Sequence, residues 1–243
     1  MKRIILNISF SIVVIVAFGF MSGCNSINVI VGSGYAVTQA RHVKDFTSID
    51  VEKAYNVVLM QGDSSSVTVV ADSNFLPLIK TQVDDGQLKI TNDGSFAGTK
   101  LLKVLVTFKK LDEIYTNGFV NLTADSNALR FEDLKIKLNG ATNLSMKLQV
   151  KKLAIKTSGA SKISLSGICD KQKVDISGAG SYNAYGLISN EANVDISGAG
   201  LAELNVTGKL FANCSGASII RYKGEPAEKH FNSSGASSIK PAE

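Results

Sequence analysis

The sequence contains no tryptophan, only two histidines and only three cysteines among its 243 residues. The two histidines, His42 and His230, lie at opposite ends of the chain, and no Cys-x-x-Cys pair occurs, so the spacing typical of a zinc site is missing. The lysines alternate with acidic residues instead of forming a basic block. The sequence therefore gives no support to nucleic-acid binding or to a metal, and we expect no cofactor.

The first 24 residues, MKRIILNISFSIVVIVAFGFMSGC, place Lys2 and Arg3 ahead of an apolar run that ends in small residues and Cys24. This order is typical of a bacterial signal peptide, which we assign to residues 1–23. The run is also long enough for a transmembrane helix, but Met21 to Cys24 resembles the lipobox of bacterial lipoproteins, with Met21 where leucine is usual. We therefore expect lipidation at Cys24 and a membrane-anchored envelope protein of the outer membrane, facing the periplasm or the outside. Removing residues 1–23 lowers the formal net charge from +5 to +3.

The heptapeptide VDISGAG occurs twice, at Val174 to Gly180 and at Val194 to Gly200. Related stretches such as LNGATNL and TSGASKI extend the pattern through the second half of the chain. Their glycines follow one another at spacings of 22, 19, 19, 20, 18 and 19 residues; they are Gly118, Gly140, Gly159, Gly178, Gly198, Gly216 and Gly235. A period near nineteen indicates one supersecondary unit repeated seven times.

Apolar and polar residues alternate on both sides of each of these glycines. Around Gly159, for example, Ile155 and Thr157 precede the glycine while Ile163 and Leu165 follow it, with polar residues between them. This alternation predicts strands with one buried face, and the Gly-Ala pair predicts a tight turn with the alanine packed inside the corner. Stacked units of this kind form an all-β fold: a right-handed parallel β-solenoid with coils of about 19 residues.

The glycine-rich motif predicts a scaffold and not a phosphate-binding loop. A phosphate loop needs a helix that begins after the glycines, usually with a Lys-Ser or Lys-Thr pair. Here SYNAY follows Gly180 and LAELN follows Gly200, and both read as strands.

We divide the mature chain into a tether, residues 24–34, and one continuous domain. Residues 35–110 keep alternating runs such as NVVLMQG but show only a weak glycine period, which predicts irregular coils that cap the N-terminal end. Residues 111–240 form the regular SGA-repeat solenoid, and its polar last repeat suits the opposite cap.

One short helix is expected between Ser73 and Val83. Asp72 or Ser73 would be its N-cap, and Pro77 would lie in the first turn or so, where proline is tolerated.

Several motifs together resemble the head GIN domain family. They are GSG at Gly32 to Gly34, Phe-x-x-Ile-x-Val from Phe46, Leu-x-Gln-Gly from Leu59, Gly-x-Leu-x-Ile from Gly86 and the serial SGA turns. Members of this family are described as auto-transporter adhesin heads and are common on bacterial envelopes, notably in the Bacteroidetes. The resemblance covers about residues 40–240. It implies a β-helix like that of the pectin lyases without their catalytic residues, and an adhesive role, but it transfers no functional residues.

Asp175 and Asp195 are the best candidates for a metal or acid–base site. They lie in the same outward column of the repeat, so we expect them on adjacent coils about 5 Å apart. Two carboxylates at this distance could share a cation, or the charge of one could raise the pKa of the other. The alternative, which we favour, is a surface ladder in which Lys156 pairs with Asp175. An enzyme that cuts acidic polysaccharides would also need a basic residue, and the arginines of the mature chain are Arg41, Arg130 and Arg221.

The remaining two cysteines fall in dissimilar places. Cys214 lies in an inward column and is expected to be a buried thiol, whereas Cys169 is expected in a loop between coils. A disulfide is allowed outside the cytoplasm, but the sequence does not show whether these two pair.

The tyrosines form no contiguous strip on which sugars could stack. Tyr182 and Tyr222 fall in inward columns, while Tyr115 and Tyr185 should face outward on different faces. We therefore expect a non-catalytic envelope lipoprotein whose rigid solenoid surface contacts proteins or glycans. The alternatives are a glycan-binding or polysaccharide-degrading β-helix protein and a structural component of the envelope.

Overall fold

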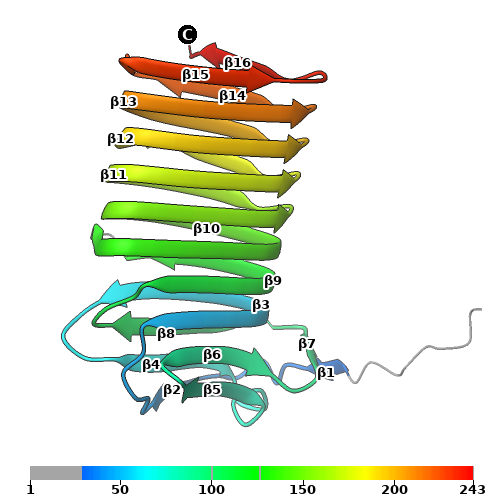
Figure 1. Ribbon diagram of the computed structural model, residues 1–243. Helices are drawn as coiled ribbons and strands as arrows, with labels where there is room; N and C mark the ends of the chain where they lie inside the picture. The colour runs from blue at the N-terminus through cyan, green and yellow to red at the C-terminus, as the bar shows by residue number, and fades with distance from the viewer. Residues whose placement is uncertain (1–28, 100, 126, 243) are drawn as a thin grey trace, which may run out of the picture.

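The computed structural model describes residues 29–99, 101–125 and 127–242, so the predicted signal peptide and Cys24 lie outside the described residues. Within these ranges every regular element is a strand, and no helix long and apolar enough to cross a membrane is found there. The strands, drawn in Figure 1, are β1 (Val29–Val31), β2 (Ala36–Arg41), β3 (Ser48–Gln61), β4 (Ser66–Asp72), β5 (Ile79–Asp84), β6 (Gln87–Asn92), β7 (Ser95–Ala97), β8 (Lys103–Phe108), β9 (Glu113–Ala124), β10 (Leu129–Gly159), β11 (Lys162–Gly178), β12 (Ser181–Gly198), β13 (Leu201–Gly216), β14 (Ile219–Lys223), β15 (Glu228–Ser233) and β16 (Ser238–Pro241).

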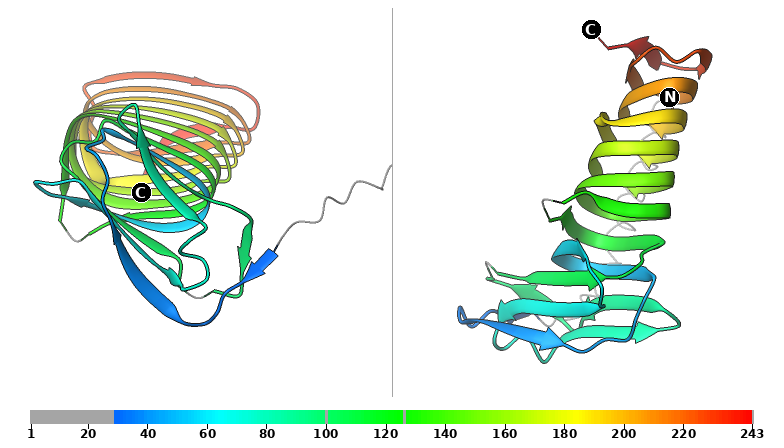
Figure 2. Two further views of the ribbon diagram at one scale, coloured as in Figure 1. Left: turned by 90° about the horizontal axis from the view of Figure 1, so that it is seen from below. Right: turned by 90° about the vertical axis from the view of Figure 1, so that its left-hand side faces the viewer.

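The repeats wind into a parallel β-solenoid of about six turns, which confirms the predicted all-β solenoid. Both views of Figure 2 show the coils stacked along one axis. Val174 pairs with Ile155 of the preceding coil and with Val194 of the next, 19 and 20 residues away in sequence. Equivalent positions of successive repeats therefore lie directly beside one another, which aligns the inward and outward columns except where the register shifts between β11 and β12 and between β12 and β13.

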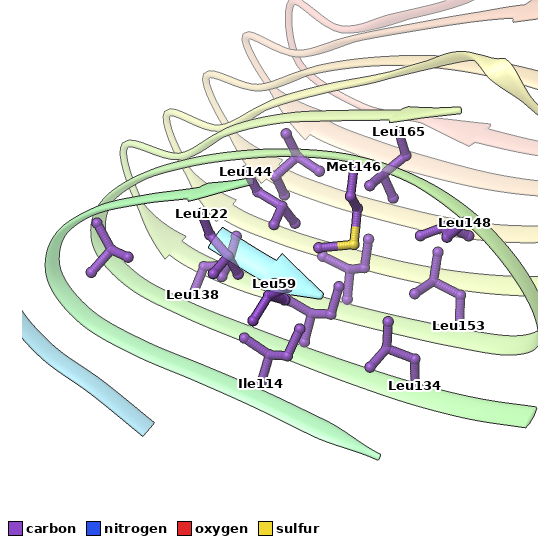
Figure 3. Close-up of a cluster of buried hydrophobic side chains, with 14 of the residues drawn as sticks. Leu59, Ile114, Leu122, Leu134, Leu138, Leu144, Met146, Leu148, Leu153 and Leu165 are labelled. Atoms are coloured by element: carbon purple, nitrogen blue, oxygen red, sulfur yellow. The ribbon is translucent and has the colours of Figure 1, made fainter. Parts of the chain in front are cut away.

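The inward columns form one apolar core along the axis. Figure 3 shows leucine and isoleucine side chains of successive coils pointing into this core, with Met146 among them. Ile114, Leu122 and Leu138 are fully buried, and burying a side chain of this size stabilises the fold by about 1.5–3 kcal/mol. In the last coil Phe231 has the same inward position but stays 43% exposed, since the described chain places no further coil over it.

A glycine with positive φ turns the chain at one corner of each coil from β9 onward. Gly159 has φ 118°, and a Cβ there would lie 2.5 Å from the carbonyl oxygen of Gly140 in the neighbouring coil. The prediction that the following alanine packs inside the corner is wrong, because Ala160 is exposed and Ser161 is buried instead. The period of two continues through the corner, because Thr157 and Ser161 are both buried, so the alanine between the glycine and Ser161 falls on the outward side.

The solenoid extends one coil further toward the N-terminus than the glycine spacing indicates. Strand β3 pairs in parallel with β9, and Ile49 lies beside Ile114. Around it, β2, β4 and β8 pair in antiparallel fashion, while β5 and β6 form a hairpin whose turn residues Asp85 and Gly86 have φ of 45° and 74°, as in a type I′ turn. Residues 29–31, within the predicted tether, form β1 and pair with β7.

The helix predicted between Ser73 and Val83 is wrong. The chain makes a turn there: the amide of Phe75 donates to the carbonyl of Asp72 and that of Ile79 donates to the carbonyl of Phe75, and β5 then begins at Ile79. Arg41 donates to the carbonyl oxygens of Leu76 and Ile79, which a continuing helix would use itself. Tertiary contacts therefore end the helical turn before it grows.

Candidate interaction face on the solenoid

One face of the solenoid carries two outward columns of hydrogen-bonding side chains, which lie one and three residues before the corner glycines. Strand alternation points these positions away from the core, and the parallel register stacks them coil upon coil. We call the two columns together the polar face. Its members are Asn117, Asn139, Ser158, Ser177, Ser197, Ser215 and Ser234 in one column, and Tyr115, Lys137, Lys156, Asp175, Asp195, Asn213 and Asn232 in the other.

A shallow groove of about 460 Å³ runs over the C-terminal half of the polar face. It is lined from Lys156 to Asn232 and from Ser177 to Ser234 across successive coils. Asp175 and Asp195 are direct register partners in its middle, so the structure brings the two predicted carboxylates together on adjacent coils. The groove presents ammonium, carboxylate, amide and hydroxyl groups over a flat floor of strands.

Hydrogen bonds between neighbouring coils fix part of the polar face. Asn213 Nδ2 donates to Asp195 Oδ1 at 2.7 Å, and Ser158 Oγ donates to Asn139 Oδ1 at 2.6 Å. Lys156 is the register partner of Asp175, as the predicted ladder requires, but no ion pair joins these two described residues within 4.0 Å. Their side chains are therefore available to a ligand, whereas Asp195 already has one donor.

Another outward column, seven residues before the corner glycines, is a ladder of ion pairs. Lys171 lies 2.8 Å from Glu191 and Lys209 lies 2.7 Å from Glu228, each pair joining adjacent coils. The hydrogen bond from Lys209, together with one from His230, lowers the pKa of the Glu228 carboxyl, and the same contact raises the pKa of Lys209. These exposed pairs contribute little to stability individually. The charges within each of these pairs neutralise each other, whereas Lys156 and Asp175 of the polar face are joined by no ion pair.

The described residues were searched for a metal site and for a basic residue beside the two carboxylates. No group of three or more His, Cys, Asp or Glu side chains that could hold a metal occurs among them. The three arginines do not line the groove. Arg41 binds turn carbonyls, Arg221 lies 3.7 Å from Glu203, and the backbone of Arg130 bonds to the Gln61 side chain.

Both described cysteines are buried and free. Cys214 lies in the core as predicted, whereas Cys169 is in β11 and only 2% exposed instead of in a loop. Burial, followed by the charge of Asp170, raises the pKa of the Cys169 thiol to about 12. Neither thiol is therefore set up as a nucleophile.

A buried polar network inside the solenoid was not found from the sequence. Tyr182 is fully buried and donates to Gln172 Oε1 at 2.7 Å; Gln172 Nε2 donates to Ser189 Oγ at 2.7 Å, and Ser189 Oγ donates to the carbonyl of Asn205. Burial raises the pKa of the Tyr182 phenol. The signal in the sequence that could have indicated this network is Gln172, a polar residue between Leu153 and Ala192 in an inward column. Tyr222 is also buried, and Tyr115 and Tyr185 face outward, as predicted.

Solved structures share this fold. A crystal structure named a putative adhesin from Bacteroides fragilis NCTC 9343 is 24% identical, with a TM-score of 0.82 over 88% of this chain and 100% of that chain. A putative lipid binding protein from Parabacteroides distasonis ATCC 8503 is 21% identical, with a TM-score of 0.72 over 88% and 100% of the two chains. A putative adhesin from Parabacteroides merdae ATCC 43184 is 23% identical, with a TM-score of 0.69 over 89% and 100%. At these identities the likeness shows the fold alone.

The comparison with curated proteins found no match. The family described as "Putative auto-transporter adhesin, head GIN domain" matches residues 45–226, which include β3 to β14 and nearly all of the polar face. Because this match covers most of the chain, the protein belongs to the head GIN domain family.

Proposed function

We propose that the protein is a non-catalytic lipoprotein of the bacterial outer membrane, anchored through Cys24, that binds protein or glycan ligands with the polar face of a right-handed solenoid. The groove around Asp175 and Asp195 carries this proposal, because it combines several kinds of hydrogen-bonding group on a rigid floor. Rigid side chains bind with a small loss of conformational entropy, which favours recognition by a surface that has no deep pocket. Membership of an adhesin family supports the same role.

The absence of catalysis is part of the proposal. The groove pairs two carboxylates with one lysine but places no arginine beside them. A flat surface open to water also lacks the enclosure that strengthens electrostatic catalysis.

The test is binding of the mature domain, residues 25–243, to arrays of glycans and host matrix proteins. We expect saturable binding that Asn213→Ala weakens by at least five-fold, since Asn213 is exposed in the groove. Asn183→Ala is the matched control, because Asn183 is also exposed but points outward from a different face, in the column of Ser164 and Glu203.

Three outcomes would contradict the proposal. Equal affinity of the two variants would exclude the polar face as the binding surface. Release of new reducing ends from any polysaccharide, followed in the same samples, would instead support the degrading enzyme. Failure of every ligand to bind would favour a structural role in the envelope.

Anchoring is tested separately in cells. A protein labelled with radioactive palmitate should carry the label, and Cys24→Ser should abolish it and leave the uncleaved precursor. A Cys169→Ser variant should keep the label, because Cys169 is buried in the core.

A further inference from the structure

Large apolar side chains are exposed at the N-terminal end of the solenoid. In the described part of the chain Val29, Val31, Tyr35 and Leu101 are 52%, 66%, 71% and 51% exposed. We call these four residues the apolar base. They belong to β1, to the segment between β1 and β2, and to the loop between β7 and β8, which lie at the opposite end of the molecule from β15 and β16 (Figure 1).

An apolar hollow adjoins the apolar base on the other side of β7. β7 pairs with β1 through Ser95 beside Val29 and Ala97 beside Val31. Ser95 and Phe96 also line a hollow of about 450 Å³, together with Leu102 and Phe119. Phe119 is 57% exposed and stands in a column where its register partners are alanines. The apolar surface therefore continues from β1 across β7 to the first corner of the solenoid.

The backbone of the apolar base is held firmly to the rest of the fold. Gly32 donates its amide to the carbonyl of Ala97 at 2.9 Å, and Asn74 Nδ2 donates to the carbonyl of Val31 at 2.8 Å. The ring of Phe96 stacks on that of buried Phe75 at 4.0 Å between centroids. The exposed valines thus lie on an ordered strand, and their exposure is not the fraying of a chain end.

The distance to the predicted lipid is short. Cys24 precedes Val29 by five residues, and five residues span at most about 18 Å when fully extended. If Cys24 carries the acyl chains, β1 cannot move further than this from the bilayer surface. The apolar base is then the part of the solenoid that stays next to lipid.

We infer that the apolar base rests in the headgroup region of the membrane to which Cys24 is attached, so that the solenoid stands away from the bilayer with its C-terminal coils outward. Valine, leucine and tyrosine side chains gain free energy by leaving water for this region, and tyrosine favours the interface because its ring is apolar and its hydroxyl stays hydrated. This contact adds a second membrane signal to the acyl anchor and fixes the direction of the polar face. The inference rests on the lipidation proposed above.

The absence of tryptophan allows a direct test. Val31→Trp and Leu101→Trp each place a single fluorophore in the apolar base, and Phe231→Trp places one in the last coil as the control. The full lipidated chains are reconstituted into vesicles that contain brominated phospholipids, which quench only tryptophans that touch the bilayer. We expect the two base tryptophans to be quenched at least three-fold more than the control, with emission shifted to the blue.

Equal quenching at the base and at position 231 would overturn the inference, because the solenoid would then move freely on its tether. Val31→Trp and Leu101→Trp are both measured, so that if one variant fails to fold, the other still tests the inference. The mass of each purified chain is determined first: a chain without acyl groups would overturn the lipid anchor and this inference together. A lipidated chain without quenching would overturn this inference alone and leave the proposed binding by the polar face intact.

Discussion

Lys53 and Gly118 are register partners at the same corner of the solenoid, and both have positive φ, 75° and 140°. A Cβ on Gly118 would collide with the carbonyl oxygen of Lys53. Every later corner uses a glycine at this position, whereas the first corner uses a lysine. The solenoid therefore begins with a corner in which an L-residue adopts a conformation that favours glycine.

Lys53→Gly should stabilise the fold. The left-handed conformation costs a residue with a Cβ about 1–2 kcal/mol, and the greater freedom of glycine in the unfolded chain offsets part of the gain. We expect a net gain of about 1 kcal/mol in the free energy of unfolding, measured by urea denaturation of the mature domain.

Lys156→Gly is the control for this prediction, because Lys156 is an exposed lysine of a regular strand without an ion pair among the described residues. There the same substitution should cost about 0.5–1 kcal/mol. A loss of stability in both variants would show that the positive φ of Lys53 is not strained.

The corner at Lys53 illustrates what the sequence could predict and what it could not. Alternation and the glycine period are local properties, so the stacked coils and the inward columns from Ile114 to Tyr222 were predictable. The first coil has the same alternation, Ile49, Val51 and Val57 being buried, but its corner lacks the glycine by which the repeats were aligned. The turn at Ser73 ends because Arg41, more than thirty residues away, binds its carbonyl groups. Such a contact between distant residues leaves no periodic pattern.

Tyr182→Phe should destabilise the fold although it removes a single oxygen atom. Without the phenol, Gln172 Oε1 is left buried without its donor, and an unsatisfied buried acceptor costs about 1–3 kcal/mol. The free energy of unfolding in urea measures the loss. Tyr185→Phe, on the outward side, should change it by less than about 0.5 kcal/mol. Equal effects would indicate that water replaces the missing donor.

This buried polar network was harder to predict from the sequence than the polar face. Outward columns follow directly from alternation, whereas Tyr182, Gln172 and Ser189 come from different columns and meet only across the interior of the coils. The repeat period predicts which residues stack in one column, but it does not predict which columns face each other across the interior.

Both cysteines should resist alkylation in the folded domain. In residues 25–243 we expect neither thiol to react at pH 8 under native conditions and both to react in denaturant, because both are buried and free. A count of one reactive thiol in the native state would show that one of these strands opens. Absence of reaction even in denaturant would show a disulfide.

Stability should fall at alkaline pH. The pKa of Cys169 is about 12 in the folded chain against an ordinary 9.0, so above pH 9 the unfolded chain loses the proton while the folded chain keeps it. The stabilisation is complete below pH 9 and decreases as the pH rises toward 12. Cys169→Ala should make the decrease shallower when the free energy of unfolding is measured across this range. An unchanged slope would assign the effect to other groups such as Tyr182.

Calcium should leave the melting temperature of the mature domain unchanged. Calcium takes six to eight oxygen ligands, whereas Asp175 and Asp195 are two carboxylates, one of which already accepts a hydrogen bond from Asn213, with the positive charge of Lys156 next to the other. The measurement is thermal unfolding with millimolar calcium and with a chelator. A calcium-dependent rise that Asp175→Ala abolishes, and that Asp170→Ala on a different part of the coil retains, would establish a metal site in the groove. In that case the polar face would bind acidic ligands through the cation, because a bound calcium ion would reverse the local charge of the two aspartates.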